Sequence, residues 1–402
     1  MFRSLRWLLG VAAVATTGTL AALPTLDAAA FIVRAADIPG TPATLAAWRS
    51  AGVQPPADLA VETRRGPVPA RLYRPDRAFT RTVVLVPGVH RDGIDEARLV
   101  ALARDITESG MAVVTVAAPD LQRFRITPEV TDVIEDAIRW TSGRPDLAPD
   151  GRVGVVGISF SGGLSVVAAG RAPVRDRVAF LLSFGGHGDL WRVLHYLTTS
   201  AVVGDLPTAQ RSGVVVGADE VRVTPPHDYG LAVVLLTVAA ELVPDGQVAP
   251  LSATIDRFLL ASSLAMVDEA AAAREFAGAR EDGEGLPEPA RTLMRHVNDR
   301  AVDALGARLA PVVDGLRNHP AMPALSAERA PTPPAAPVFL LHGADDNVIP
   351  SAETVLLGAY LNGKAPVRGL LSSLITHAEM NRAPTASDVW RLASFWRAVL
   401  AN

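Results

Sequence analysis

The stretch Gly157-Ile158-Ser159-Phe160-Ser161-Gly162-Gly163 follows a short apolar run and precedes a second one at 164–169. This order predicts a tight turn that leads from a buried strand into a helix. A serine at such a turn projects its hydroxyl from the end of the sheet, provided that the residues two before and two after it are small. Gly157 and Ser161 meet that need around Ser159. We therefore predict that Ser159 is a nucleophile at the edge of an α/β sheet.

Two alternatives remain for this turn. Ser161 stands where the Gly-x-Ser-x-Gly pattern has glycine, and it lies between the small residues Ser159 and Gly163, so it is a rival nucleophile. We prefer Ser159 because the expected strand ends at Gly157, which places Ser159 at the turn and Ser161 inside the helix. The second alternative is an ordinary Gly/Ser-rich turn that has no catalytic role.

Short apolar runs alternate with helical periodicity on both sides of this turn. Strands are expected at 82–86, 111–116, 152–157, 178–183, 338–342 and 367–371, an antiparallel hairpin at 60–64 and 69–73, and helices at 94–109, 130–138, 351–361 and 386–400. Strands without polar alternation, separated by helices, are typical of a parallel sheet that is covered on both faces. The pattern predicts an α/β fold with a mostly parallel sheet.

The alternation stops near residue 187 and resumes at residue 337. The residues between are rich in Ala, Leu and Val with helical spacing, and a proline-rich stretch closes the block. We expect a core in two parts, 60–186 and 337–402, that is interrupted by a helical cap at 187–336. Residues 31–59 are expected to form a linker and a short helix.

The first residues resemble a targeting signal. Arg3 and Arg6 precede the uncharged run Trp7–Leu23, whose 17 residues are at the lower limit for crossing a bilayer. We expect residues 1–30 to be a signal peptide or membrane anchor, which would place the protein in the cell envelope, exported or membrane-associated. The alternative is an N-terminal helix that packs on the domain.

Composition excludes several classes of protein. The net charge is −4 without long runs of one sign, so no nucleic-acid partner is expected. The chain has no cysteine, which excludes disulfides and thiolate chemistry. No His/Asp/Glu set has metal-ligand spacing and no glycine loop fits a phosphate, so we expect neither a metal nor a cofactor.

Residues that could activate a serine follow later in the chain. A serine hydroxyl needs a base, and the base needs an orienting carboxylate. Asp345 and Asp346 follow the strand expected at 338–342, and His377 follows the last expected strand. The order Ser, Asp, His is the one used by α/β hydrolases.

Two segments carry a family resemblance. Val153-Gly-Val-Val-Gly-Ile-Ser-Phe-Ser-Gly-Gly-Leu164 and Leu341-His-Gly-Ala-Asp-Asp-Asn-Val-Ile-Pro350 are similar to the nucleophile and acid segments of the α/β-hydrolase superfamily. From about residue 60 to 400, apart from the cap, the chain resembles esterases similar to dienelactone hydrolases. The resemblance implies the α/β-hydrolase fold, Asp346 rather than Asp345 as the acid, and His377 as the base.

An oxyanion hole is expected from backbone N–H groups. One is that of Phe160, directly after the nucleophile, and the other belongs to the loop after the first parallel strand. That loop reads Val86-Pro-Gly-Val-His90. Relatives commonly have His-Gly in place of Pro87-Gly88, so by position Val89 is the expected second donor.

Other polar residues have weaker claims. His90 and His187 lie near strand ends and could point into the pocket, but a surface or loop-capping role is preferred for each. Asp189 is an alternative acid. His227 and Tyr229 could line a substrate channel or simply begin a helix.

The sequence predicts a serine hydrolase that cleaves a carboxylic ester or related acyl bond through an acyl-enzyme. Its substrate would be a small molecule with an apolar part, because the expected cap is apolar. The alternative is a binding or scaffold protein that retains the hydrolase fold without catalysis.

Overall fold

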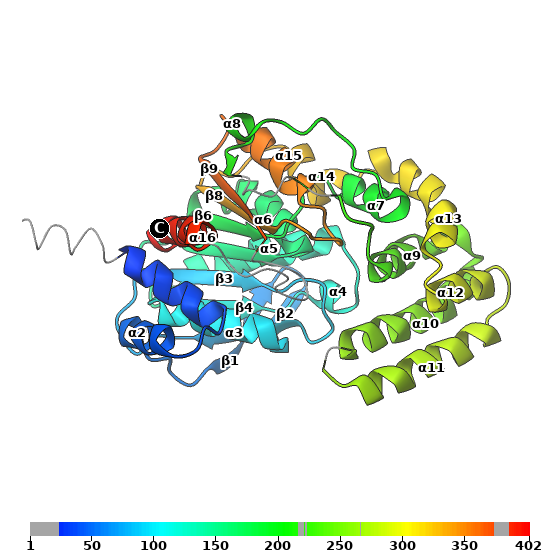
Figure 1. The fold of residues 1–402 in the computed structure, drawn as a ribbon, viewed down its shortest axis with the longest axis horizontal. Helices are drawn as coiled ribbons and strands as arrows, with labels where there is room; N and C mark the ends of the chain where they lie inside the picture. Colours follow the sequence, from blue (N-terminus) through cyan, green and yellow to red (C-terminus); the bar gives the residue numbers. More distant parts are fainter. Residues whose placement is uncertain (1–23, 216–220, 222, 266, 374–385) are drawn as a thin grey trace, which may run out of the picture.

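In the computed structural model, which describes residues 24–215, 221, 223–265, 267–373 and 386–402, nine strands form one sheet (Figure 1). The spatial order is β1-β2-β4-β3-β5-β6-β8-β9-β7. The β1–β2 and β2–β4 pairs are antiparallel, and every other pair is parallel. The strands are β1 (Ala57–Thr63), β2 (Gly66–Tyr73), β3 (Thr82–Val86), β4 (Ala112–Val116), β5 (Val153–Ile158), β6 (Val178–Phe184), β7 (Val214–Val215), β8 (Val338–Gly343) and β9 (Val367–Ser372).

The strands expected from the apolar runs are confirmed, and burial explains why the runs lack alternation. Every residue of β3 and β4 is buried. In β3, Val84 and Val86 join the core on one side of the sheet, while Val83 and Leu85 join the core on the other. Because both faces are covered, both sets of side chains must be apolar.

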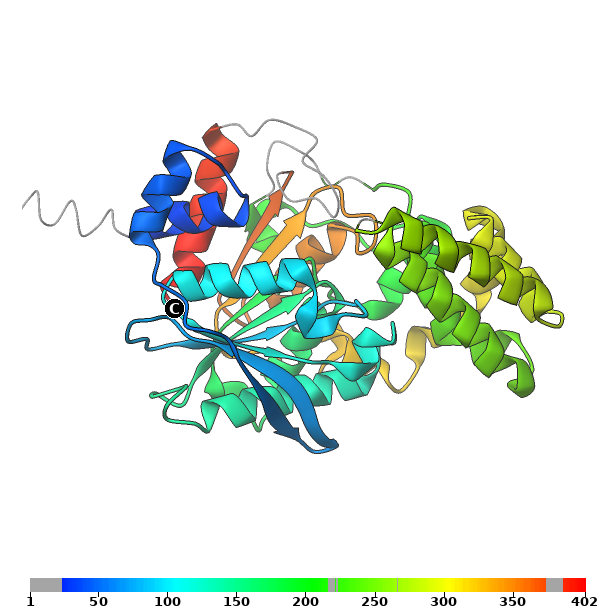
Figure 2. The same cartoon turned by 90° about the horizontal axis from the view of Figure 1, so that it is seen from below.

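Helices cover the two faces as layers (Figure 2). On one side, residues 24–35 pack with α3 (Ala97–Glu108) and α16 (Ala386–Leu400) in the smaller core cluster, where the rings of Phe31 and Trp396 lie 4.1 Å apart. The larger cluster on the other side includes α5 (Pro128–Ser142), α6 (Phe160–Gly170) and α15 (Ala352–Leu361). Leu121 of α4 (Pro119–Gln122) also belongs to the larger cluster, whereas neither cluster includes a residue of α2 (Thr41–Arg49).

The inserted block is mostly helical, as expected. It contains α7 (Leu190–Thr199), α8 (Ala209–Ser212), α9 (Asp228–Leu242), α10 (Asp245–Leu264), α11 (Glu269–Gly285), α12 (Ala290–Asn298), α13 (Val302–Gly315) and α14 (Met322–Leu325). Helices α9 to α13 stand together at one end of the molecule (Figure 1). The block is not purely helical, however, because Val214 and Val215 form β7 and pair with Gly369 and Leu370 of β9. Two residues are too few to show a strand period in the sequence.

The N-terminal boundaries also differ from the expected ones. Residues 24–35 are helical, so the expected boundary at residue 30 divides a helical segment whose Ala28 and Phe31 are buried. The 31–59 stretch holds the end of this segment, α2 and the start of β1 rather than a free linker. Residues 1–23, which carry most of the expected signal or anchor, lie outside the described residues. Of the helices that are described, none combines the length and apolarity needed to cross a bilayer.

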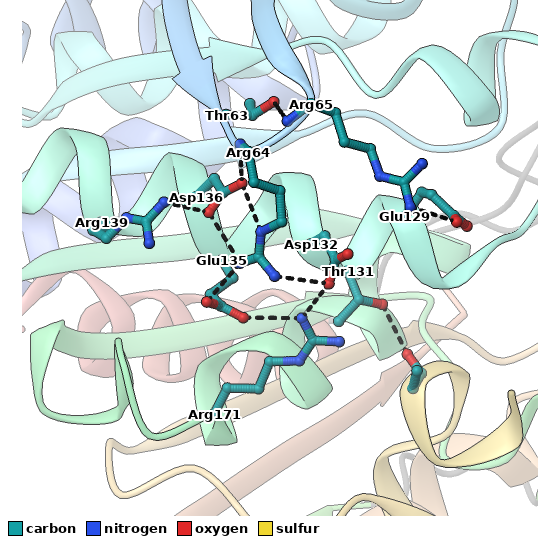
Figure 3. A network of polar contacts seen from close by, with 11 residues as sticks. Thr63, Arg64, Arg65, Glu129, Thr131, Asp132, Glu135, Asp136, Arg139 and Arg171 are labelled. Carbon is teal, nitrogen blue, oxygen red and sulfur yellow. Dashed lines mark hydrogen bonds and ion pairs between the residues drawn. The ribbon is translucent and has the colours of Figure 1, made fainter.

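An ion-pair network fastens the β1–β2 hairpin to α5 (Figure 3). The carboxylate of Asp136, which is fully buried, accepts hydrogen bonds from the backbone N–H and the guanidinium of Arg64 and from Arg139. Glu135 binds Arg64 and also Arg171 of the loop after α6. Burial opposes ionisation of Asp136, but the hydrogen bonds and charges of Arg64 and Arg139 outweigh it and lower its pKa.

Replacing Asp136 by asparagine should lower the free energy of unfolding by about 2–4 kcal/mol, because it removes the buried charge that pairs with both Arg64 and Arg139. Glu129→Gln is the control, since its pair with Arg65 is solvent-exposed and should contribute less than about 1 kcal/mol. The pKa of Asp136 is lowered on folding, so its stabilising effect is present above about pH 4 and lost as pH falls through the lowered value. Urea unfolding of both variants at several pH values measures this. Equal losses in the two variants would contradict it.

Candidate active site

The strand order and directions are those of the α/β-hydrolase fold, which places its reactive groups at the carboxyl ends of the parallel strands. The carboxyl ends of β3, β5, β6 and β8 are neighbours in this sheet. The residues that follow these strands therefore lie along one edge of the sheet.

Ser159 stands between β5 and α6 in a backbone conformation that L-residues rarely adopt, with φ 56° and ψ −130°. Its N–H donates to the carbonyl of Phe184 at the end of β6, at 2.7 Å. A Cβ at Gly157 would lie 2.4 Å from the backbone oxygen of Ser161, so only glycine fits before the turn. The strained residue is thus held by its neighbours, and its side chain is partly exposed.

Ser161, the rival nucleophile, is fully buried. Its hydroxyl oxygen accepts a hydrogen bond from the N–H of Ile158 at 2.8 Å and lies within bonding distance of the carbonyl oxygens of Val86 and Ile158. These contacts join the start of α6 to β3 and β5. They also show why serine is accommodated where the motif has glycine.

The loop after β3 approaches the serine closely. A Cβ at Gly88 would lie 3.2 Å from the Cβ of Ser159, which leaves room for little more than glycine there. Val89 follows in this loop, and Phe160 is the first residue of α6. Within the described residues, neither the N–H of Phe160 nor that of Val89 makes a hydrogen bond. A helix N-terminus also favours negative charge beside Phe160.

Asp346 lies in the loop after β8 and is buried, whereas Asp345 beside it is exposed. The Oδ1 of Asp346 accepts hydrogen bonds from the N–H groups of Val348 and Ile349, at 2.9 and 3.0 Å. These two bonds fix the orientation of the carboxylate. Its Oδ2 faces the turn after β6, where a Cβ at Gly185 would lie 3.7 Å away.

The same turn brings the serine and the acid to one place. Ser159 is bonded to Phe184, and the next residue, Gly185, donates its N–H to Leu341 of β8 and faces Asp346. Two of the three expected triad residues therefore flank a single two-residue stretch at the carboxyl edge of the sheet.

The third residue, His377, lies outside the described residues. Its segment follows β9, which pairs with β8 up to Gly343 and Ser372. The N–H of Ala344 also donates to the carbonyl of Ser372. The chain that carries His377 therefore leaves the sheet beside the loop of Asp346, and the role of His377 stays a prediction.

Sequence reasoning missed His342, which supports the acid loop. The ring is fully buried, its Nε2 lies 2.9 Å from the carbonyl of Ile349, and its Nδ1 lies 2.6 Å from the hydroxyl of Thr354. Because a carbonyl only accepts, Nε2 carries the proton, and it also lies 3.3 Å from Oδ2 of Asp346. The signal was present in the segment after β8, where histidine directly precedes the Gly-Ala-Asp-Asp turn.

The weaker candidates have structural partners. His90 accepts a hydrogen bond from the N–H of Asp92, which is the loop-capping role preferred from the sequence. Asp189, the alternative acid, caps α7 through the N–H of Trp191 and pairs with Arg329 at 2.6 Å. The carboxylate of Asp189 therefore links the start of α7 to Arg329 near the end of the cap.

His187 does not lie at the surface, because its ring is fully buried against α6. Its Nε2 donates to the carbonyl of Leu325, and a Cβ at Gly163 would collide with the ring. Burial lowers the pKa of His187 to about 4, although Asp189 and Glu328 oppose this shift. The sequence could not show this because His187 belongs to a loop that the cap covers.

The buried His187 should make stability depend on pH. Its pKa falls on folding, so the unfolded chain takes up the proton first, and the free energy of unfolding should decrease by up to about 3 kcal/mol between pH 6.5 and pH 4. His187→Gln can keep the bond to Leu325 without titrating, so its stability should vary less across this range. Denaturant unfolding at each pH tests this, and parallel profiles for the two proteins would rule it out.

The start of α9 contacts three loops at the carboxyl edge. The hydroxyl of Tyr229 lies 3.5 Å from the carbonyl of Val89, its ring packs edge-on against Phe124, and the N–H of His227 donates to Asn347. His227 is exposed and accepts from the N–H of Tyr229, which agrees with a helix-start role. Tyr229 instead points into the molecule beside the expected oxyanion loop.

No protein-family model matches the sequence, and no curated protein matches it. Solved structures similar to this chain include an esterase from Pyrobaculum calidifontis (16% identity, TM-score 0.41, covering 88% of this chain and 87% of that one). Brefeldin A esterase, a bacterial homologue of human hormone-sensitive lipase, has 12% identity and a TM-score of 0.42, covering 94% and 84%. Dienelactone hydrolase from Anabaena variabilis has 13% identity and a TM-score of 0.40, covering 86% and 97%. Sequence identities and TM-scores this low do not indicate which reaction the site carries out.

Proposed function

We propose that this chain is a serine-dependent hydrolase that cleaves a carboxylic ester or related acyl bond. The observation that carries the proposal is the strained backbone of Ser159, a partly exposed residue directly before the start of a helix. Such strain costs of order 1–3 kcal/mol and is kept where the surrounding structure enforces it for a function.

The proposed reaction has two steps. The Ser159 Oγ attacks the carbonyl carbon while His377 takes its proton, and the N–H groups of Phe160 and Val89 hold the oxyanion. His377 then gives this proton to the leaving alcohol, and the acyl-enzyme remains. Water, deprotonated by the same histidine, attacks the acyl carbon and releases the acid and Ser159.

The acid of the proposed triad is Asp346. Two backbone N–H groups hold its Oδ1, so the carboxylate is oriented before substrate binds. In this role it would keep the His377 tautomer that can accept the serine proton. Asp345 is exposed, so solvent screens its charge.

The proposed substrate is a small acyl compound with an apolar part. Helix α9, whose start contacts the loop of Val89, is apolar over most of its length, and residues 230–236 are all buried. An apolar helix beside the site favours an apolar group on the substrate.

A fluorophosphonate probe followed by peptide mapping tests this proposal. The probe should label the unmodified protein, and the mass shift should map to Ser159. Hydrolysis of short p-nitrophenyl esters should fall in proportion to labelling. A protein that folds but takes no label would instead be a binding or scaffold protein that retains the fold.

We also propose that the N-terminal segment places the protein in the cell envelope. The support is the sequence alone, namely Arg3 and Arg6 before the uncharged run Trp7–Leu23. Fractionation of cells that express the full chain tests this, and recovery of the protein only in the cytosol would contradict it.

A further inference from the structure

Large apolar side chains are exposed mainly at one corner of the molecule. Six of the nine such residues in the described chain belong to residues 24–35, the turn after them, α2 and α16. The six are Leu26, Ile38, Leu45, Trp48, Val389 and Trp390. The other three, Leu206, Val223 and Val267, stand singly in connecting segments, so they form no patch.

Contacts between the three helical segments make this corner one unit. Phe31 packs on Trp396 of α16, and Asp27 pairs with Arg49 of α2. Leu45 and Trp48 are three residues apart on α2, so they share a helix face. Figure 2 shows these helices together, and we call them the N-terminal corner.

The exposure at this corner is unusual for a surface in water. Trp48 is 79% exposed and Trp390 is 63% exposed. Tryptophan favours the interface between lipid and water, where its ring is shielded and its N–H stays hydrated. A group of exposed apolar residues with two tryptophans therefore fits a bilayer surface.

The sequence places a membrane-seeking segment next to this corner. The uncharged run Trp7–Leu23 follows Arg3 and Arg6, and only Pro24 and Thr25 separate its end from Leu26. Arginine before an apolar run suits attraction to anionic headgroups. The run therefore ends three residues before Leu26, the first exposed apolar residue of the N-terminal corner.

We propose that the N-terminal corner docks on the surface of a lipid bilayer, with Leu45 and Trp48 entering the interface. Two weak signals together give more stable membrane binding than either alone, and here the apolar run and the patch would be those two signals. The proposal does not depend on the catalytic one, because no residue of the N-terminal corner belongs to the candidate site.

Docking in this way has a consequence for the substrate. The N-terminal corner and helices α9 to α13 lie at opposite ends of the molecule (Figure 1), and α9 adjoins the candidate site. The site would then face the water, and substrates would arrive from solution rather than from the bilayer.

The chain has no cysteine, so a single introduced one can report the surroundings of one position. In the full-length protein, Leu45→Cys carries the environment-sensitive dye NBD, and vesicles of phosphatidylcholine and phosphatidylglycerol are added. Leu206→Cys is the matched control, because Leu206 is 44% exposed and Leu45 is 53% exposed. The emission at position 45 should shift to the blue and rise several-fold, while that at 206 should not change.

Adding Trp48→Ser to the Leu45→Cys protein should reduce this response, because the neighbouring ring no longer enters the interface. A response at position 45 without vesicles would mean that a second copy or the segment 7–23 covers the patch, which would overturn the proposal. Vesicle binding without any change at position 45 would also overturn it, since segment 7–23 would then anchor the chain alone.

Discussion

Replacing Ser159 by alanine is expected to lower kcat for ester hydrolysis by at least about 10⁴-fold, because it removes the atom that forms the acyl-enzyme. The fold should be little changed, since Ser159 is held through its backbone bond to Phe184 rather than through its side chain. Alanine has the same Cβ as serine, so the strain caused by the positive φ at position 159 should stay similar. Initial rates and fluorophosphonate labelling measure the effect.

Ser161→Ala is the matched control for this experiment. Its hydroxyl bonds the N–H of Ile158 and contacts Val86, so its loss should destabilise the protein by about 1–3 kcal/mol. Labelling should nevertheless survive, because Ser161 is fully buried and no probe reaches it. If labelling were lost in Ser161→Ala and kept in Ser159→Ala, the assignment of the nucleophile would be wrong.

The strands of the core were predictable because burial on both faces removes polar alternation. The expected run 82–86 coincides with β3, and the run 338–342 falls one residue short of β8. Runs this short and this apolar, bounded by turn residues, are typical of strands that are covered on both faces. The parallel arrangement followed from the helices between them.

The elements that were missed depend on contacts from distant parts of the chain. β7 has two residues and is a strand only because β9 lies beside it. Residues 24–30 resembled the end of an exported segment, yet Ala28 packs in the smaller core cluster with residues of α3 and α16. Sequence periodicity cannot reveal a partner that is hundreds of residues away.

In the candidate site too, some features could be predicted from the sequence and others could not. The turn at Ser159 was predictable because its chemistry needs small neighbours at fixed spacing, and Gly157 has no room for a side chain. The part played by Ser161 was not predictable, because its partner Val86 lies 75 residues earlier. His342 was missed because its support of Asp346 depends on how the loop after β8 folds back over the ring.

Asp346→Asn is expected to lower kcat by about 10⁴-fold, since an amide cannot hold the catalytic histidine in the productive tautomer. The asparagine carbonyl can still accept the N–H groups of Val348 and Ile349, but its amide would face the Nε2–H of His342, so the protein should fold with a stability lowered by about 1–3 kcal/mol. Asp345→Asn makes the same chemical change on the adjacent, exposed residue and should leave kcat within about twofold, because solvent screens the charge of an exposed carboxylate.

Asp346→Asn also tests the role of His377 indirectly, because the proposed acid acts only by orienting the base. His377→Ala should reduce kcat more than Asp346→Asn, and the double variant should be little slower than His377→Ala, because triad residues act as a unit. Steady-state rates of the two single variants and the double variant decide this. If the losses multiplied in the double variant, Asp346 and His377 would act independently, and the base would have to be sought elsewhere along the carboxyl edge.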